Sequence, residues 1–212
     1  MKSINLICFL LFASFSVFSQ APEGFSKMDD IPQFRAAIQE TIGSIRTLKS
    51  DFTQAKHLSI FSKTIDSEGV LVFKAPDRLK WTYKSPYHYE IIINKNTISI
   101  NDGGKVNSFD LSSSEKFSEI NELILNSITG KILDDERFKT TYFQNDKFWL
   151  VVLEPENNEM SGFISEIQIY VEPVKNRVSK IRLVESANDY TVIHFSNQIL
   201  NEPIADSLFN TP

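Results

Sequence analysis

The chain has 212 residues, of which 42% are hydrophobic and 23% charged, and its formal net charge at pH 7 is −5. This length and composition predict one globular domain that can bury a full core without disulfides. An acidic chain gains no attraction to nucleic acid or to anionic lipid head groups, so we expect no nucleic-acid partner.

The N-terminal segment has the pattern of a secretory signal peptide. Lys2 supplies a positive start, residues 4–18 form a mostly apolar run, and small residues precede a cleavage point before Gln20. We therefore predict a signal peptide over residues 1–19 and a single domain over residues 20–212. The alternative is an uncleaved membrane anchor, but the apolar run is shorter than the ~20 residues that a membrane span requires.

The mature chain lacks the groups that common enzymes use. The single cysteine, Cys8, lies inside the predicted leader, so no cysteine nucleophile and no disulfide remain. The sequence contains no serine-hydrolase, zinc-peptidase or nucleotide-binding motif. His57, His88 and His194 show no local metal-ligand spacing. We therefore expect no catalysis, no metal site and no cofactor.

An amphipathic helix follows the polar residues 21–29. Asp30 is suited to cap this helix, and Pro32 stands in its first turn. Apolar residues then recur at spacings of three and four, which predicts one helical stripe. The stripe consists of Phe34, Ile38, Ile42, Ile45 and Leu48. Gly43 falls inside the predicted helix, at a cost of about 1 kcal/mol relative to alanine.

Strand patterns dominate the rest of the chain and predict about ten or eleven strands. Their ranges are 50–57, 65–75, 78–84, 87–93, 97–100, 106–111, 138–144, 148–153, 163–171, 178–185 and 190–195. A second helix is expected between Ser114 and Gly130. Its apolar residues at helical spacing are Phe117, Ile120, Ile124 and Ile128, with Leu123 beside them. Many antiparallel strands in series predict a strongly curved or incompletely closed sheet with the helices on its concave side.

The strand of residues 78–84 alternates between an apolar face and a cationic face. The apolar face carries Leu79, Trp81 and Tyr83, and the other face carries Arg78, Lys80, Thr82 and Lys84. Leu71 and Phe73 stand on one phase of the strand before the turn. These apolar faces either seal an ordinary core or line a pocket for an apolar ligand. Aromatic residues interleaved with cations also occur in proteins that bind single-stranded nucleic acid, but the predicted export and the acidic balance argue against that function.

Three motifs in this region give the chain a resemblance to the LolA family of periplasmic lipoprotein carriers. Residues 52–54 read F-T-Q, as does the family's strand after the first helix. Residues 69–76 match its G-x-L-x-[LFV]-K-x-P strand, and residues 76–86 match its P-x-x-[FL]-x-W-x(4)-P hairpin. The resemblance covers most of the mature chain, although the C-terminal half matches only in its strand pattern.

The resemblance implies an unclosed antiparallel β-barrel with a helical lid over a hydrophobic cavity that accepts the acyl chains of lipoproteins. It implies a monomeric, periplasmic, non-enzymatic carrier. The carrier would take its cargo from an ATP-driven inner-membrane transporter and pass it to an outer-membrane receptor. The cavity residues would be Phe52, Leu71, Phe73, Leu79, Trp81 and Tyr83. The lid residues would be Ile42, Leu123, Ile124 and Ile128.

One departure from the family pattern concerns the lid. Members often have an arginine directly before the proline that matches Pro76, and this arginine latches the lid across the cavity. Here Ala75 takes that position, and the nearest arginine, Arg78, lies on the opposite strand phase from Leu79. The lid is therefore expected to close by apolar packing alone or to open more easily. Two alternatives stay open, namely a carrier of free lipid or lipid-linked pigment, and a lipoprotein-sensing module on the same fold.

Overall fold

The computed structural model describes residues 21–61, 63–113, 122, 125–128, 130–156, 158–186 and 188–211. The predicted signal peptide, the predicted lid residues Leu123 and Ile124, and most of the predicted second helix lie outside these residues. The structure therefore does not test them.

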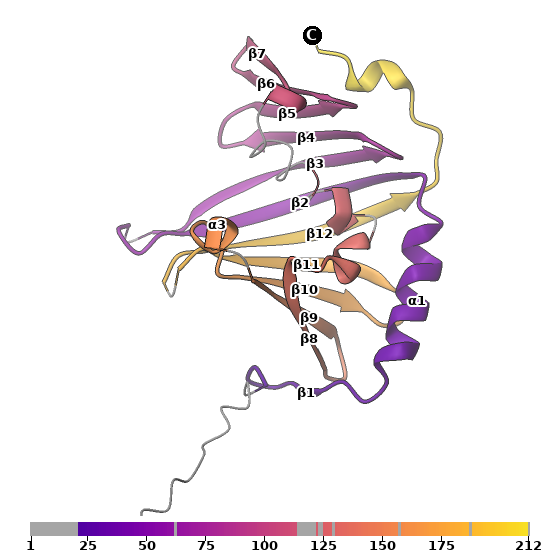
Figure 1. Ribbon diagram of the computed structural model, residues 1–212. Helices are drawn as coiled ribbons and strands as arrows, with labels where there is room; N and C mark the ends of the chain where they lie inside the picture. The colour runs from indigo at the N-terminus through magenta and orange to yellow at the C-terminus, as the bar shows by residue number, and fades with distance from the viewer. Residues whose placement is uncertain are drawn as a thin grey trace, which may run out of the picture.

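One antiparallel sheet of twelve strands organises the described chain (Figure 1). Its strands are β1 (Ser26–Lys27), β2 (Thr47–His57), β3 (Ile65–Lys74), β4 (Arg78–Ser85), β5 (Tyr89–Asn94), β6 (Thr97–Asp102), β7 (Lys105–Asp110), β8 (Phe138–Gln144), β9 (Trp149–Pro155), β10 (Glu166–Glu172), β11 (Arg177–Val184) and β12 (Tyr190–Leu200). Their order is β1-β8-β9-β10-β11-β12-β2-β3-β4-β5-β6-β7, so β1 and β7 are free edges and the sheet is not closed. The predicted open antiparallel sheet is confirmed, with the short edge strand β1 added at a segment expected to be loose.

Within the described residues, two α-helices have defined bounds, α1 (Ile31–Gly43) and α3 (Asn158–Ser161). The sequence predicted a turn where the short α3 lies. Short 3-10 helices span Leu111–Ser113, Lys131–Asp134 and Asp206–Phe209. Residues 125–128, from the predicted second helix, are helical.

Helix α1 begins as predicted but ends earlier. The Asp30 carboxylate accepts a hydrogen bond of 2.8 Å from the Gln33 N–H, which caps the first turn. The predicted stripe through Leu48 is wrong, because the helix ends at Gly43 and Leu48 lies in β2. The Arg46 N–H bonds to the Asn201 side chain at 2.7 Å rather than to a carbonyl of the preceding turn. After this contact with Asn201, the chain continues as β2, although the spacing of its apolar residues would still allow a helix.

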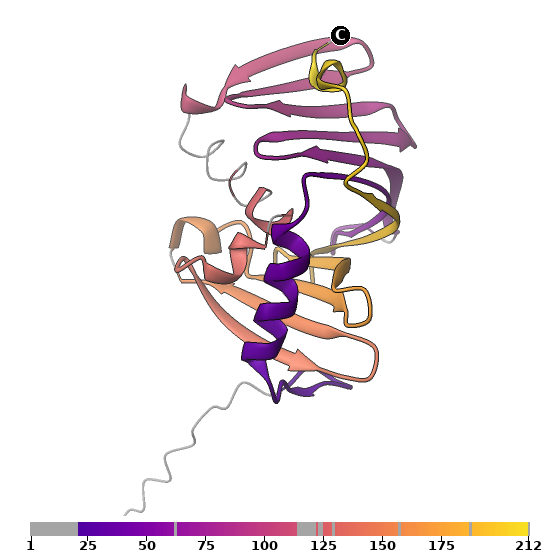
Figure 2. The ribbon, with the colours of Figure 1, turned by 90° about the vertical axis from the view of Figure 1, so that its right-hand side faces the viewer.

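The inner face of the sheet, which we define as the face covered by α1, has two separate cores. One core joins Phe34 and Ile38 of α1 to residues of β9 and β10 such as Val151 and Ile169. The other core lies on β3 to β5 and contains Leu71, Phe73, Leu79, Ile93 and Leu111. Figure 2 shows the two halves of the bent sheet, with α1 along the lower half. The region between the two cores is where the candidate site lies.

The outer face is also covered in two places, although the sequence predicted a wet, cationic face for β4. Near the N-terminus, Phe25 packs against Phe143 and Tyr170 of β8 and β10. At the other end of the chain, Phe209 is buried against Val72 and Ile92 of β3 and β5. These two segments shield apolar outer positions, so the inner face is not the only apolar side of the sheet.

Candidate functional site

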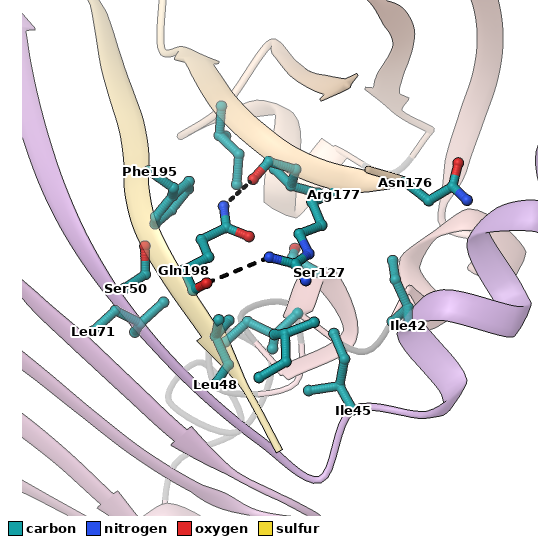
Figure 3. A pocket seen from close by; sticks show the side chains of 14 residues that line it. Ile42, Ile45, Leu48, Ser50, Leu71, Ser127, Asn176, Arg177, Phe195 and Gln198 are labelled. Atoms are coloured by element: carbon teal, nitrogen blue, oxygen red, sulfur yellow. Dashed lines mark hydrogen bonds between the residues drawn. The ribbon is translucent and has the colours of Figure 1, made fainter. Parts of the chain in front are cut away.

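An apolar pocket lies on the inner face where the two cores meet (Figure 3). Its apolar lining residues are Ile42, Ile45, Leu48, Leu71, Ile128, Val178, Ile181, Phe195 and Leu200. They come from the end of α1, from the loop that follows it, from β2 and β3, from β11 and β12, and from the helical residues 125–128. The pocket is narrow and encloses about 560 Å³ of empty space, including the part that opens to solvent. The part of the pocket that a water molecule can occupy is about 70 Å³, well below the volume of ordinary small-ligand sites, which is about 300–1,000 Å³.

Polar groups gather on one wall of the pocket, where β11 faces β12. Arg177 Nη1 donates to the Gln198 carbonyl at 3.4 Å, and Gln198 Nε2 donates to the Val178 carbonyl at 2.7 Å (Figure 3). Asn176 also lines the pocket, and its buried Oδ1 has no hydrogen-bond partner among the described residues. A buried polar atom without a partner costs free energy, so this wall can accept further hydrogen bonds.

An aromatic cluster adjoins the pocket on the inner face. The Phe52 ring lies 4.8 Å from the ring of Trp81 and 5.2 Å from that of Tyr83, measured between centroids. The Trp81 ring lies 6.3 Å from that of Phe195, which lines the pocket. Leu71, another lining residue, is directly opposite Trp81 in the ladder between β3 and β4. The cluster is therefore a continuation of the pocket wall.

Two polar tips lie within this aromatic cluster. The Tyr83 hydroxyl donates to Gln54 Oε1 at 3.1 Å, and burial raises the pKa of Tyr83 despite that hydrogen bond. The buried Trp81 Nε1 has no hydrogen-bond partner within the described part of the chain. The wall thus offers apolar surface together with an unused donor.

All six predicted cavity residues lie on the inner face, so the strand phase inferred from the sequence agrees with the ladders. They do not share one environment. Leu71 lines the pocket, whereas Phe73 and Leu79 are sealed in the core, with exposed fractions of 0% and 1%. Phe52, Trp81 and Tyr83 belong to the aromatic cluster.

Two of the predicted lid residues, Ile42 and Ile128, lie in the described part of the chain, and both line the pocket. Ala75, at the position of the family's latch arginine, packs against the core of β3 to β5. Arg78 lies on the outer face and pairs with Asp206 at 2.6 Å. It is therefore already bound away from the pocket.

The sequence interpretation missed the wall formed by β11 and β12. Val178, Ile181 and Phe195 belong to predicted strands, but nothing local shows that these strands meet β2. The only available signal was their alternating apolar pattern. The pairing of β12 with β2 turns that pattern into a pocket wall.

An open antiparallel sheet with an apolar pocket on its inner face has the features of a protein that holds apolar ligands. Residues 43–212 match the model of the family described as outer membrane lipoprotein carrier protein LolA. The match spans most of the chain, and the chain therefore belongs to the LolA family. This is a periplasmic family of carriers rather than enzymes.

Individual relatives agree with this membership. An outer-membrane lipoprotein carrier protein from Francisella tularensis subsp. tularensis is 26% identical over 99% of this chain and 92% of its own length. A protein of the same description from subsp. novicida is 25% identical over 81% of this chain and 80% of its own length.

Two solved structures match over most of this chain. The crystal structure of MucB has a TM-score of 0.50 at 8% identity, covering 85% of this chain and 62% of its own. A LolA superfamily protein from Nitrosomonas europaea has a TM-score of 0.47 at 8% identity, covering 85% of this chain and 97% of its own. In the part of the chain that the structure describes, no helix combines the length and the apolar character that a membrane span requires.

Proposed function

We propose that the protein is a periplasmic carrier that binds the acyl chains of lipoproteins on the inner face of its sheet and moves them from the inner to the outer membrane. The observation that carries this proposal is the apolar pocket between the two cores, in a chain of the LolA family. The signal peptide over residues 1–19 and the single domain over residues 20–212 are part of the proposal. So are the inner-membrane transporter that loads the carrier and the receptor that unloads it.

The energetics of the cargo explain why such a carrier needs an apolar pocket. Each CH₂ group contributes about 0.8 kcal/mol to membrane anchoring, so a chain of ~14 CH₂ groups contributes about 11 kcal/mol. A lipoprotein therefore does not leave a membrane unaided. The carrier has to offer comparable apolar surface, and its narrow pocket has to widen to admit a chain.

We place the moving parts at the end of α1 and at residues 125–128, which carry Ile42 and Ile128. The proposed lid has Ala75 in place of the family's latch arginine, and Arg78 is bound on the outer face. In this proposal the lid closes by apolar packing. Opening the lid would break the contacts that Ile42 and Ile128 make with the sheet.

A release assay with Ile128→Glu tests the proposal. The mature protein is incubated with spheroplasts, and the lipoprotein recovered in soluble complex is measured. A carboxylate inside the apolar pocket is expected to lower this recovery about tenfold or more. Val174→Glu is the matched control, because Val174 is 97% exposed and outside the pocket.

Each outcome of this assay separates the alternatives. Equal recovery with Ile128→Glu and with the wild type would contradict the pocket assignment. Recovery of free lipid or pigment without attached protein would reassign the chain to another apolar cargo. Specific binding of a lipoprotein without its release from the membrane would favour the sensing module.

A further inference from the structure

The ladder between β11 and β12 stops before either strand ends. Backbone pairing runs from Val184 and Tyr190 to Lys180 and His194. Residues 177–179 of β11 and residues 195–200 of β12 follow without a register pair between the two strands. The end of β12 instead pairs only with β2. We call this unpaired stretch the β11–β12 gap.

Irregular backbone on both strands keeps the gap open. In β12 the register shifts between Ser196 and Ile199, and Asn197 has a φ of 51°. The Asn197 side chain donates to Asp51 of β2 at 2.8 Å, which holds this bulge on the β2 side. In β11 a bulge opposite Tyr170 and Val171 inserts one extra residue. Because both strands deviate at the same level, their backbones cannot continue the ladder.

Two side-chain contacts bridge the gap in place of the ladder. They are the hydrogen bonds from Arg177 to the Gln198 carbonyl and from Gln198 to the Val178 carbonyl, at 3.4 Å and 2.7 Å (Figure 3). Side-chain contacts can exchange for contacts with a ligand without separating paired strands. The gap is therefore a weak point of the sheet at the wall of the pocket.

The gap connects an apolar hollow with a polar one. Arg177, Phe195 and Gln198 line the inner pocket and also a second hollow of about 590 Å³, a volume that includes the part open to solvent. The other residues of the second hollow are Glu172, Lys175, Ser179, Ser196 and Asn197. Ser196 lies opposite Asp51 in the pairing of β12 with β2. Ser50 and Phe52, on either side of Asp51, point to the inner face, so Asp51 and Ser196 point to the outer face. The second hollow therefore reaches the outer face. An amphiphile fits this pair of hollows better than a purely apolar molecule does.

The Arg177 side chain has spare donors in the gap. No carboxylate among the described residues lies within ion-pair distance of its guanidinium, and the adjacent Glu172 pairs with Lys175 at 2.8 Å instead. A guanidinium has five N–H donors, and the structure gives Arg177 one long hydrogen bond. Uncharged carbonyl acceptors suit such a group at an apolar boundary, because they bring no second charge into it.

We propose that the β11–β12 gap is the subsite for the polar linkage of an acylated cargo. The acyl chains occupy the inner pocket, and the glyceryl ester carbonyls accept hydrogen bonds from the Arg177 guanidinium and the Gln198 amide. The polypeptide that follows the acylated residue leaves over the polar hollow on the outer face. This inference rests on the proposed function and adds the part of the cargo that the apolar pocket does not recognise.

A pair of synthetic lipopeptides tests the subsite. One carries two palmitoyl chains joined by esters to the glyceryl group of its N-terminal cysteine. The other carries the same chains joined by ethers, which lack the carbonyl acceptors. We expect the wild-type protein to bind the ester about tenfold more tightly, as a hydrogen bond to a charged donor predicts. Arg177→Met should remove most of this preference and still bind the ether form.

Arg182→Met is the matched control for that experiment. Arg182 lies on β11 with its guanidinium 4.4 Å from the Tyr190 ring and lines neither hollow. The control should keep the wild-type preference. A wild type without a preference, or an Arg177 variant that keeps it, would overturn the subsite. If neither lipopeptide binds, it is the proposed function that fails.

Photo-crosslinking maps the path of the polypeptide independently. Benzoylphenylalanine is placed at Ser196, at the outer mouth of the gap, and in a second variant at the exposed Lys139 of β8. With the ester lipopeptide bound, the probe at Ser196 should capture its peptide part several times more efficiently. Equal capture at the two positions, with binding intact, would exclude the exit through the gap.

Discussion

Gly69 shows how one residue shapes the aromatic wall of the site. A Cβ atom at this position would lie 1.9 Å from the Thr82 carbonyl oxygen and 2.7 Å from the Phe52 ring. The register between β3 and β4 shifts at the same point, between Glu68 and Gly69. The glycine is therefore needed for close approach rather than for a left-handed backbone.

We predict that Gly69→Ala destabilises the protein by about 3 kcal/mol, the upper end of the cost of overpacking, because a backbone carbonyl cannot move aside. Urea unfolding followed by circular dichroism measures this difference. Gly43→Ala is the control, since a Cβ there meets nothing within 4 Å and should stabilise the protein by about 0.5–1 kcal/mol. A Gly69 variant as stable as the wild type would contradict the packing argument.

The sequence predicted which face of the sheet a side chain points to better than it predicted the role of that side chain. Period-two alternation was enough to place Leu71, Leu79 and Trp81 on one face, as the ladders show. Alternation does not distinguish the sealed Leu79 from the pocket-lining Leu71. That difference depends on Ile128 and Phe195, which reach the pocket from distant parts of the chain.

At the scale of elements, the segment after β12 acts as a strap on the outer face. Lys74 Nζ donates to the Ile204 carbonyl at 2.6 Å, and Asp206 pairs with Lys74 and Arg78 at 2.5 Å and 2.6 Å. The Asn94 amide donates to the Phe209 carbonyl at 3.3 Å. The cations of the predicted wet face of β4 are thus partly used to hold the C-terminal segment.

This strap should loosen in acid. The hydrogen bonds from Lys74 and Arg78 hold the pKa of Asp206 below its ordinary value. A carboxyl whose pKa is lower in the folded state stabilises above its unfolded pKa, near ~3.9, and loses this effect as the pH falls through the folded pKa. We expect NMR relaxation of residues 205–211 to report rising mobility in that window. Asp206→Asn should be mobile already at pH 6 and show little pH dependence; a rigid Asn variant would contradict the strap.

Element boundaries were predictable where they depend on local residues. The Asp30 cap and the β8 strand agree with the sequence prediction because short-range contacts set them. The end of α1 did not agree, since it depends on Asn201, which is far away in the sequence. The sequence did not predict the strap for the same reason, because the residues that Phe209 packs against are far from it in the sequence.

For the whole molecule, the two cores place the two tryptophans in different surroundings. Trp149 packs against Phe34 of α1, with ring centroids 5.2 Å apart. Trp81 lies beside the pocket and contacts Phe195. The chain has two tryptophans in all, so each can be observed alone in a variant that replaces the other with phenylalanine.

We predict that a lipopeptide with brominated acyl chains quenches the emission of Trp81 in the Trp149→Phe variant by about half or more. Bromine quenches an indole only at close range, and Trp81 lies beside the acyl site proposed above. Trp149 in the Trp81→Phe variant should be quenched much less. The same lipopeptide without bromine controls for binding alone. Stronger quenching of Trp149 than of Trp81 would indicate that the acyl chains bind in the core under α1 instead.

The connectivity of the sheet has a consequence for how the protein is made. Strands β2 to β7 and β8 to β12 each pair with their neighbours in sequence, whereas β12 and β2 join across the chain, as the hydrogen bond from Ser50 to the Ser196 carbonyl over 146 positions illustrates. Such a distant pairing forms late, because loop closure must precede it. The pocket takes Leu48 from β2 and Phe195 from β12, so a folding chain has no complete pocket until these two strands have paired.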